Sequence, residues 1–306
     1  MPSARQGSIH LFRFSGIDVF LHWSWFLVAA IEIQNRKGSY SSVAWNVAEY
    51  LALFLIVMIH EFGHALACRQ VGGRADRIVL WPLGGVAYVD PPPRPGATLW
   101  SIAAGPLVNV VLIPILYVAV TMGQSAGMAS TAPDLLQLLQ TVSLINVGLL
   151  IFNILPIYPL DGGQILRSLL WFVMGRARSL MVATVLGLIG VAGFIGLALL
   201  KQSVWYGALA AFMLMNCWSG LQHARALLRL AKLPRRDGFV CPTCKTSPPI
   251  GEYWKCGKCG QAFDTFQNHA TCPHCSTQYA QTKCLDCGRL SPMHDWMVAS
   301  LVPSKF

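Results

Sequence analysis

VAWNVAEYLALFLIVMIHEFGHALA occupies residues 43–67 and decides what kind of fold this chain can adopt. The stretch is mostly apolar and is long enough to cross the hydrocarbon core of a bilayer as a helix. His60, Glu61 and His64 stand near its end, and a helix places residues i and i+4 on one face. Two imidazoles and a carboxylate are costly inside a membrane, so their presence there indicates a functional site.

The HExxH spacing predicts a metal site on this helix. His60 and His64 can bind one zinc ion together, and Glu61 lies beside them, placed to take a proton from a water on the metal. A structural pair of core histidines is the alternative interpretation.

The composition agrees with a membrane protein that carries a smaller polar part. Of the 306 residues, 54% are hydrophobic and only 12% are charged, about half the charged fraction of ordinary soluble domains. The net charge of +10 comes from 23 Lys and Arg against 13 Asp and Glu. Nucleic-acid binding can produce such an excess, but positively charged flanks of membrane helices explain it without a further partner.

The apolar segments predict about six membrane spans, with five as the alternative count. We expect them at Val19–Ile33, Val43–Ala67, Thr98–Thr121, Leu135–Leu155, Ser179–Leu200 and Val204–Leu221. The first segment is the weakest because it is short and contains His22 and Glu32. Its aromatic residues nevertheless suit a span that enters from a membrane interface.

The distribution of Lys and Arg predicts the orientation of these spans. With a cytosolic N-terminus, fourteen basic residues lie on the cytosolic side, and only Arg36, Lys37 and Lys201 lie outside. Cytosolic loops carry the excess of basic residues in membrane proteins. We therefore expect an integral protein of a bacterial or archaeal cell membrane, with both termini in the cytosol and His60 and His64 in the cytosolic half of their span.

Residues Arg77–Val89, between the second and third spans, read as a strand pair or re-entrant hairpin. β-Branched residues flank Pro82 and a Gly84-Gly85 turn, a pattern typical of hairpins. A strand edge beside the metal can clamp an unfolded substrate segment; a structural brace is the alternative.

Asp161 is the predicted third metal ligand, since a catalytic zinc usually has three protein ligands and a water. It lies in the segment NILPIYPLDGG, residues 153–163, just after the fourth span. Pro156 and Pro159 must break the helix there, and the two glycines that follow Asp161 permit a tight reversal. Under the predicted topology, this carboxylate and the two histidines reach the same side of the membrane.

These motifs, taken in order, resemble the site-2 protease family of intramembrane metalloproteases. The resemblance covers roughly residues 10–225 and rests on His60–His64, on AAGPLVN at residues 103–109 and on residues 153–163. It implies that His60, His64 and Asp161 bind zinc, that Glu61 is the general base and that Asn153 positions substrate or stabilises the oxyanion. Gly105, Pro106 and Asn109 would be packing residues near the site. The resemblance also implies that the substrate is a transmembrane protein, which is cut in or near its membrane span.

Some polar and small residues have simpler interpretations. Asn153 is equally well explained as a helix cap, and His22 and Asn109 as hydrogen-bonding groups between helices. Gly187, Gly190, Gly193 and Gly196 recur at every third position, a stripe that lets helices approach closely.

The C-terminal segment predicts a cytosolic domain that depends on metal. Its four Cys-x-x-Cys pairs are Cys241 and Cys244, Cys256 and Cys259, Cys272 and Cys275, and Cys284 and Cys287. Paired cysteines at this spacing indicate zinc in a reducing compartment, and a segment this short needs the metal to fold. We expect two structural zinc ions, with knuckles that are consecutive in the sequence sharing an ion.

The tail resembles a double zinc ribbon, a class that binds proteins or nucleic acids. Its few basic residues are scattered, which favours a cytosolic regulatory protein as the partner over nucleic acid; a purely structural cap is the alternative. Residues 221–236, which join it to the membrane, read as a basic amphipathic helix near anionic headgroups.

Together these patterns predict an all-α polytopic membrane protein with a small β-hairpin near the active site. The predicted domains are residues 1–225 (intramembrane metalloprotease), 226–240 (basic juxtamembrane linker) and 241–306 (double zinc ribbon). The predicted function is a zinc endopeptidase embedded in the lipid bilayer, with one catalytic zinc. The alternatives are a non-catalytic membrane scaffold and a metal transporter that uses His60, His64 and Asp161 for transit.

Overall fold

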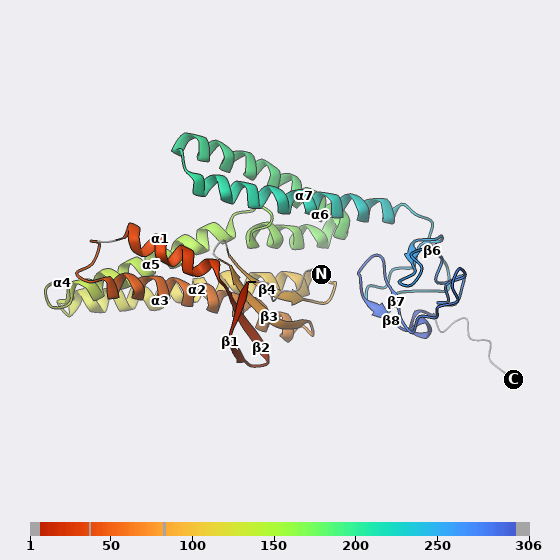
Figure 1. Cartoon of the computed structure of the whole chain (residues 1–306), viewed down its shortest axis with the longest axis horizontal. Helices are drawn as coiled ribbons and strands as arrows, with labels where there is room; N and C mark the ends of the chain where they lie inside the picture. The colour runs from red at the N-terminus through yellow and green to blue at the C-terminus, as the bar shows by residue number, and fades with distance from the viewer. Residues whose placement is uncertain (1–6, 37, 82–83, 298–306) are drawn as a thin grey trace. The chain divides into compact units, whose positions relative to one another are not determined.

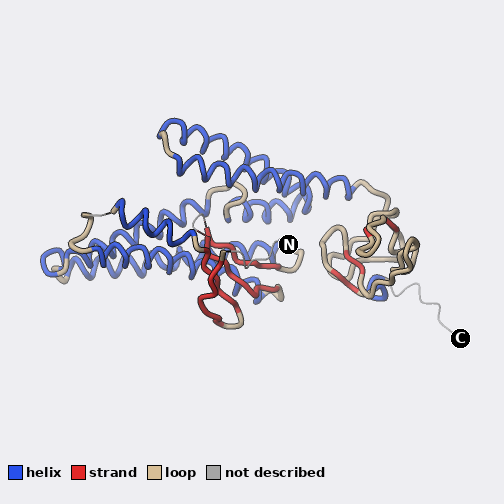
Figure 2. Tube along the Cα trace, in the orientation of Figure 1, coloured by secondary structure: helices blue, strands red, loops and turns tan. Residues whose placement is uncertain are grey.

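A computed structural model describes residues 7–36, 38–81 and 84–297, and for residues 84–87 and 205 it describes the backbone alone. The chain folds as two units that divide between Leu221 and Gln222. Each unit is described by itself (Figures 1 and 2).

Long helices dominate the first unit. They are listed in chain order as α1 (Ser24–Asn35), α2 (Val43–Gln70), α3 (Pro95–Ser125), the short α4 (Met128–Thr131), α5 (Pro133–Ile154), α6 (Asp161–Lys201) and α7 (Val204–Ala231). Figure 1 shows α1, α2, α3 and α5 running alongside one another. Among the described residues, 4 helices are long and apolar enough to cross a membrane, namely α2, α3, α5 and α6.

The predicted first span, Val19–Ile33, is wrong as a single membrane helix. Ile17–His22 forms strand β2, and helix α1 begins only at Ser24. At 1.5 Å per residue its 12 residues extend about 18 Å, which is shorter than a hydrocarbon core of about 30 Å. Among the aromatic residues of this segment, Trp25 packs edge-on against Tyr50 and Phe54 and so fixes α1 to α2, whereas Trp23 and Phe26 are exposed.

The remaining predicted spans correspond to helices. The segment Ser179–Leu200 is the second part of α6, which has a kink at Gly175, where the backbone φ is 79°. The segment Val204–Leu221 lies in α7, which also contains Trp205, a residue whose side chain is not described.

A four-stranded sheet lies beside the C-terminal part of α2. Its strands, in spatial order, are β1 (Ser8–Phe14), β2 (Ile17–His22), β3 (Arg74–Trp81) and β4 (Gly84–Asp90). The predicted hairpin is therefore confirmed as β3 and β4, although Pro82 lies outside the described residues. The parallel pairing of β2 with β3, in which Asp18 faces Arg77, brings the N-terminal hairpin into the same sheet.

Alternate residues of β2 and β3 bury the sheet against α2. Ile17, Val19 and Leu21 form a core with Ile78 and Leu80 of β3 and with Ala65 and Cys68 of α2. Successive side chains of a strand point to opposite faces, so one face of each strand meets the helix that carries the histidines. This packing fixes the end of α2 at which the metal-binding motif stands.

Glycines permit close contacts at two places in this unit. A Cβ atom on Gly63 would lie 2.7 Å from the Ala104 carbonyl oxygen, so α2 and α3 approach each other at that point. The predicted glycine stripe on α6 is confirmed only in part. Gly187 and Gly190 pack against the loop residues Tyr158 and Ile157, whereas Gly193 and Gly196 have open space around them.

The second unit is small and holds short strands, listed as β5 (Trp254–Lys255), β6 (Ala262–Phe263), β7 (Thr282–Lys283) and β8 (Leu290–Ser291), followed by a 3₁₀ turn at Met293–Trp296. Cysteines make up half of the buried cluster, and Trp254 and Trp296 are its largest members. Arg235 and Arg236, expected near lipid headgroups, instead form ion pairs with Asp286 and Asp264 of the same unit, with N to O distances of 2.7 and 2.5 Å.

We predict that Gly63→Ala destabilises the protein by about 1–3 kcal/mol, because the added methyl group meets rigid backbone and forces α2 away from α3. Thermal unfolding of the purified protein in detergent checks this. Gly148→Ala is the matched control: it is also within a helix but has nothing within 4 Å of the added atom, so it should leave stability unchanged or slightly higher. Equal effects of the two changes would contradict the close helix contact.

Candidate active site

Helix α2 carries three buried polar side chains at its C-terminal end. His60, Glu61 and His64 are only 5%, 6% and 5% exposed. Their metal-binding atoms all lie within 4.8 Å of one another. The helical spacing therefore groups the side chains as the sequence predicted, in a setting from which solvent is largely excluded.

Asp161, about a hundred positions later in the chain, reaches the same point. Its Oδ2 atom lies 3.0 Å from His60 Nε2 and 3.3 Å from His64 Nε2, and the two Nε2 atoms are 3.1 Å apart. Ligand atoms bound to zinc at ordinary bond lengths in a tetrahedron are separated by about 3.3 Å. The three atoms therefore fit three corners of a zinc site, and the fourth corner is left for water or substrate.

Both imidazoles are held so that Nε2 is free to bind a metal. His60 Nδ1 donates to Asn109 Oδ1 at 2.6 Å, and His64 Nδ1 donates to the Ser101 carbonyl oxygen at 2.9 Å. Asn109 in turn donates to Asn146 Oδ1 at 2.8 Å. Such partners fix the ring orientation and tautomer of metal-binding histidines and raise their affinity for the ion.

These contacts revise the interpretation of Asn109 and add Asn146. Asn109, predicted as a packing residue, contacts the candidate ligand His60 directly, and both asparagines are fully buried. The sequence analysis did not single out Asn146. The signal that could have found it is an amide side chain in the middle of an apolar span, which needs a hydrogen-bonding partner.

Gly105 of α3 leaves the room in which an ion would sit. A Cβ atom there would overlap the ring of His64 and would lie 2.8 Å from His60 Nε2. Any larger side chain would displace the imidazoles or occupy the metal position. The AAGP segment thus has a steric role at the site in addition to its role in helix packing.

The segment between α5 and α6 delivers Asp161. Helix α5 ends at Ile154, and Asp161 is the first residue of α6. The next two residues must be small, because a Cβ on Gly162 would overlap the Ile154 carbonyl and one on Gly163 would overlap the Tyr158 backbone nitrogen. The predicted helix break and tight reversal are therefore confirmed.

A cavity of about 770 Å³ opens at this site. Its wall includes His60, Glu61, His64 and Asp161, together with Asn153 at the end of α5. It extends between α1 on one side and residues of α6 and α7 on the other, and most of its remaining lining is apolar. His22 does not line it. This residue ends strand β2 and stacks on Trp81 of β3 with ring centroids 3.8 Å apart, so the prediction that it hydrogen-bonds between helices is wrong.

Comparison with known proteins agrees with this geometry. The profile of peptidase family M50 matches residues 48–132 and 124–197, which include His60, His64 and Asp161. The chain belongs to peptidase family M50. A zinc metalloprotease of Methanocaldococcus jannaschii is 33% identical over 180 residues, which cover 59% of this chain and 50% of that protein. The stage IV sporulation protein FB of Bacillus subtilis is 35% identical over 119 residues, 38% of each chain.

A solved structure supports the same assignment at the level of the fold. The site-2 protease from Methanocaldococcus jannaschii aligns with 70% of this chain and 95% of its own, at 28% identity and a TM-score of 0.52. The predicted resemblance to site-2 proteases is thereby confirmed. The chain spans less than two thirds of the length of the curated relatives it matches.

The eight tail cysteines form two further candidate metal sites, and the predicted pairing of consecutive knuckles is wrong. Cys241 and Cys244 join Cys284 and Cys287, while the other set is Cys256, Cys259, Cys272 and Cys275. The knuckles are therefore nested, the first with the fourth and the second with the third. The turn between β5 and β6 holds the second knuckle, of the inner set, and the turn between β7 and β8 holds the fourth knuckle, of the outer set. Sequence order alone does not specify this pairing.

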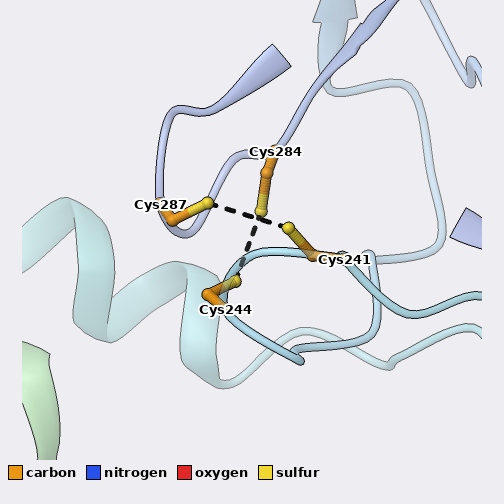
Figure 3. Close-up of side chains that lie close together, drawn as sticks. All are labelled: Cys241, Cys244, Cys284 and Cys287. Carbon is orange, nitrogen blue, oxygen red and sulfur yellow. Dashed lines mark hydrogen bonds between the residues drawn. The ribbon is translucent and has the colours of Figure 1, made fainter. Parts of the chain in front are cut away.

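The sulfur geometry suits zinc in both sets. Figure 3 shows the four sulfurs of the outer set pointing toward one another. Cys241 and Cys287 are 3.7 Å apart at Sγ, as are Cys244 and Cys284, close to the spacing of about 3.8 Å in a tetrahedral zinc–thiolate site. The hydrogen bond with Cys284 lowers the pKa of the Cys244 thiol to about 5, which favours the thiolate that binds metals.

We predict that Asn109→Leu weakens zinc binding at His60, His64 and Asp161 by about 10–100-fold, because His60 loses the acceptor that orients its ring. Competition with a chromogenic chelator measures this affinity. Asn153→Ala is the control, since Asn153 lies on the cavity wall and, within the described part of the chain, forms no hydrogen bond with a histidine. The zinc affinity of this variant should equal that of the wild type. Unchanged zinc affinity in Asn109→Leu would contradict the orienting role.

The nested pairing makes a distinct prediction for metal content. Replacing all four cysteines of the first and fourth knuckles by serine should remove one zinc ion per chain and leave the inner set loaded. Replacing the four cysteines of the first and second knuckles should remove both ions, because each set then lacks two ligands. Elemental analysis of the full-length protein measures the zinc content of both variants. Loss of both ions in the first variant and of one ion in the second would establish sequential pairing.

Proposed function

We propose that this chain is an intramembrane zinc endopeptidase that hydrolyses peptide bonds in or near the transmembrane segments of other membrane proteins. The observation that carries the proposal is the triangle of His60 Nε2, His64 Nε2 and Asp161 Oδ2, with sides of 3.0 to 3.3 Å, at the wall of a large cavity. Membership of a peptidase family supports it. The named relatives include a zinc metalloprotease, which makes zinc the metal of choice.

His60, His64 and Asp161 would be the ligands of one catalytic zinc. A zinc ion held there would act as a Lewis acid toward the substrate carbonyl and would acidify water. Glu61, next to His60 on the cavity wall and 6% exposed, accepts the proton of the attacking water and delivers it to the leaving amine, the role of a general acid and base. Asn153 hydrogen-bonds the substrate backbone or the developing oxyanion.

The rest of the proposal concerns the chain's place in the membrane. The catalytic domain, residues 1–225, crosses the bilayer about six times: α7 adds to the four long apolar helices, and α1, too short to span alone, makes the remaining passage together with the preceding strand β2. Both termini are cytosolic, as the distribution of Lys and Arg indicates. Residues 226–240 link this domain to residues 241–306, where two structural zinc ions are held by eight cysteines and a cytosolic regulatory protein binds.

We predict that Glu61→Gln leaves zinc bound but lowers peptide hydrolysis by about 10²–10⁴-fold, the usual contribution of general acid–base catalysis. Membrane proteomes of cells that carry the wild type or the variant are compared for a protein that accumulates uncut only in the variant. Zinc content is measured on the same purified proteins.

Glu252→Gln is the matched control, because Glu252 is an exposed carboxylate in the second unit. It should behave as the wild type. Indistinguishable proteomes for Glu61→Gln and the wild type would overturn the protease proposal. Zinc flux through vesicles containing the Glu61→Gln protein would favour the transporter alternative.

A further inference from the structure

The catalytic cavity has a second polar position, on α1, that the hydrolytic chemistry does not use. Trp25, Val28 and Glu32 all line the cavity. Spacings of three and seven residues place them on one face of a helix. A carboxylate thus lies on the same wall as two apolar side chains, within a space lined mainly by apolar groups.

Glu32 lies well away from the zinc ligands along the helix axes. It shares with Leu53 of α2 the walls of the catalytic cavity and of a neighbouring cavity of about 30 Å³. Leu53 precedes His60 by seven residues on the same helix, a rise of about 10 Å. An extended chain advances about 3.3 Å per residue, so a substrate cut at the zinc site would place its third neighbouring residue near Glu32.

Arg36 attracts this carboxylate electrostatically but does not hydrogen-bond to it. Glu32 lies in the last turn of α1, where the helix dipole disfavours negative charge. Arg36, one turn later, donates to Glu49 at 2.6 Å, and Tyr50 donates to the Trp25 carbonyl at 2.6 Å. Within residues 7–36, 38–81 and 84–297, no hydrogen bond or ion pair joins the Glu32 carboxylate to another side chain.

We propose that Glu32 is a specificity-determining residue that selects substrates with a Lys or Arg side chain about three residues from the scissile bond, toward the end of the cavity away from the zinc. This inference rests on the proposed function. Glu32 is exposed within this unit, so a substrate side chain can reach it, and a basic side chain brought to this position would form a charge-assisted hydrogen bond, which is stronger than one between neutral groups. A neutral side chain there would leave the carboxylate with only its attraction to Arg36.

The test uses synthetic apolar peptides that contain a central Asn-Gly pair and one Lys, which is moved through successive positions. A matched set has Gln in place of Lys. Binding is measured with the zinc-loaded full chain carrying Glu61→Gln in detergent micelles, and cut sites are mapped by mass spectrometry with Glu61 intact. We expect the best Lys peptide to bind about tenfold or more tightly than its Gln partner, with Lys at a constant distance from the cut.

Variants of Glu32 make the test specific. Glu32→Gln should abolish the preference for Lys without weakening the Gln peptides, and Glu32→Lys should transfer the preference to peptides with Glu at the same position. Asp134→Asn changes a half-buried carboxylate of the α5 N-terminus that accepts hydrogen bonds from Ser41 and does not line the cavity, and it should keep the preference for Lys.

The outcomes separate this inference from the proposed function. Cutting or binding without a preference for Lys, or a preference that survives Glu32→Gln, would overturn the role of Glu32 and leave the protease intact. A Glu32-dependent preference in binding without any cutting would support the role of Glu32 in recognition and count against proteolysis.

Discussion

The structure depends on bringing one carboxylate against two imidazoles inside an apolar helical bundle. His60, His64 and Asp161 are nearly buried, and their ligand atoms lie within 3.3 Å of one another. Isolated charges at such depth are strongly disfavoured, so the cluster is stable only with its members together and its other hydrogen bonds satisfied. Much of the surrounding architecture serves that requirement.

Three neighbouring features stabilise the buried cluster of His60, His64 and Asp161 in different ways. The Asn146–Asn109 pair and the Ser101 carbonyl satisfy the outer nitrogens of the histidines. Gly105 leaves the volume for an ion, and the two glycines after Asp161 let α6 start directly from the Pro-containing loop. Ser101, Gly105 and Asn109 lie on α3, Asn146 lies on α5, and the two glycines lie at the start of α6. A change in the packing of α2, α3 and α5 would therefore alter the metal site as well as the fold.

The second unit is also organised around groups of side chains that can hold a metal ion. Its buried cluster consists of eight members, four of them cysteines, and its strands have two residues each. Apolar burial on this scale supplies little stability, so metal coordination would provide much of the folding free energy. The nested order of the knuckles also ties the start of this unit to its end, because Cys241 and Cys287 belong to one set.

The sequence by itself determined the local features. Apolar length specified α2, α3, α5 and the second part of α6, helical spacing grouped His60 with His64, and Pro156 and Pro159 ended α5, because each depends on residues close together in the chain. Only the tertiary structure decided that β2 pairs with β3 and that α1 is a short helix packed on α2. It also decided that Asn146 hydrogen-bonds to Asn109, which hydrogen-bonds to His60, and that the cysteine knuckles are nested. Those outcomes depend on contacts between distant segments, whose free energy is set by packing and hydrogen bonding that no local pattern records.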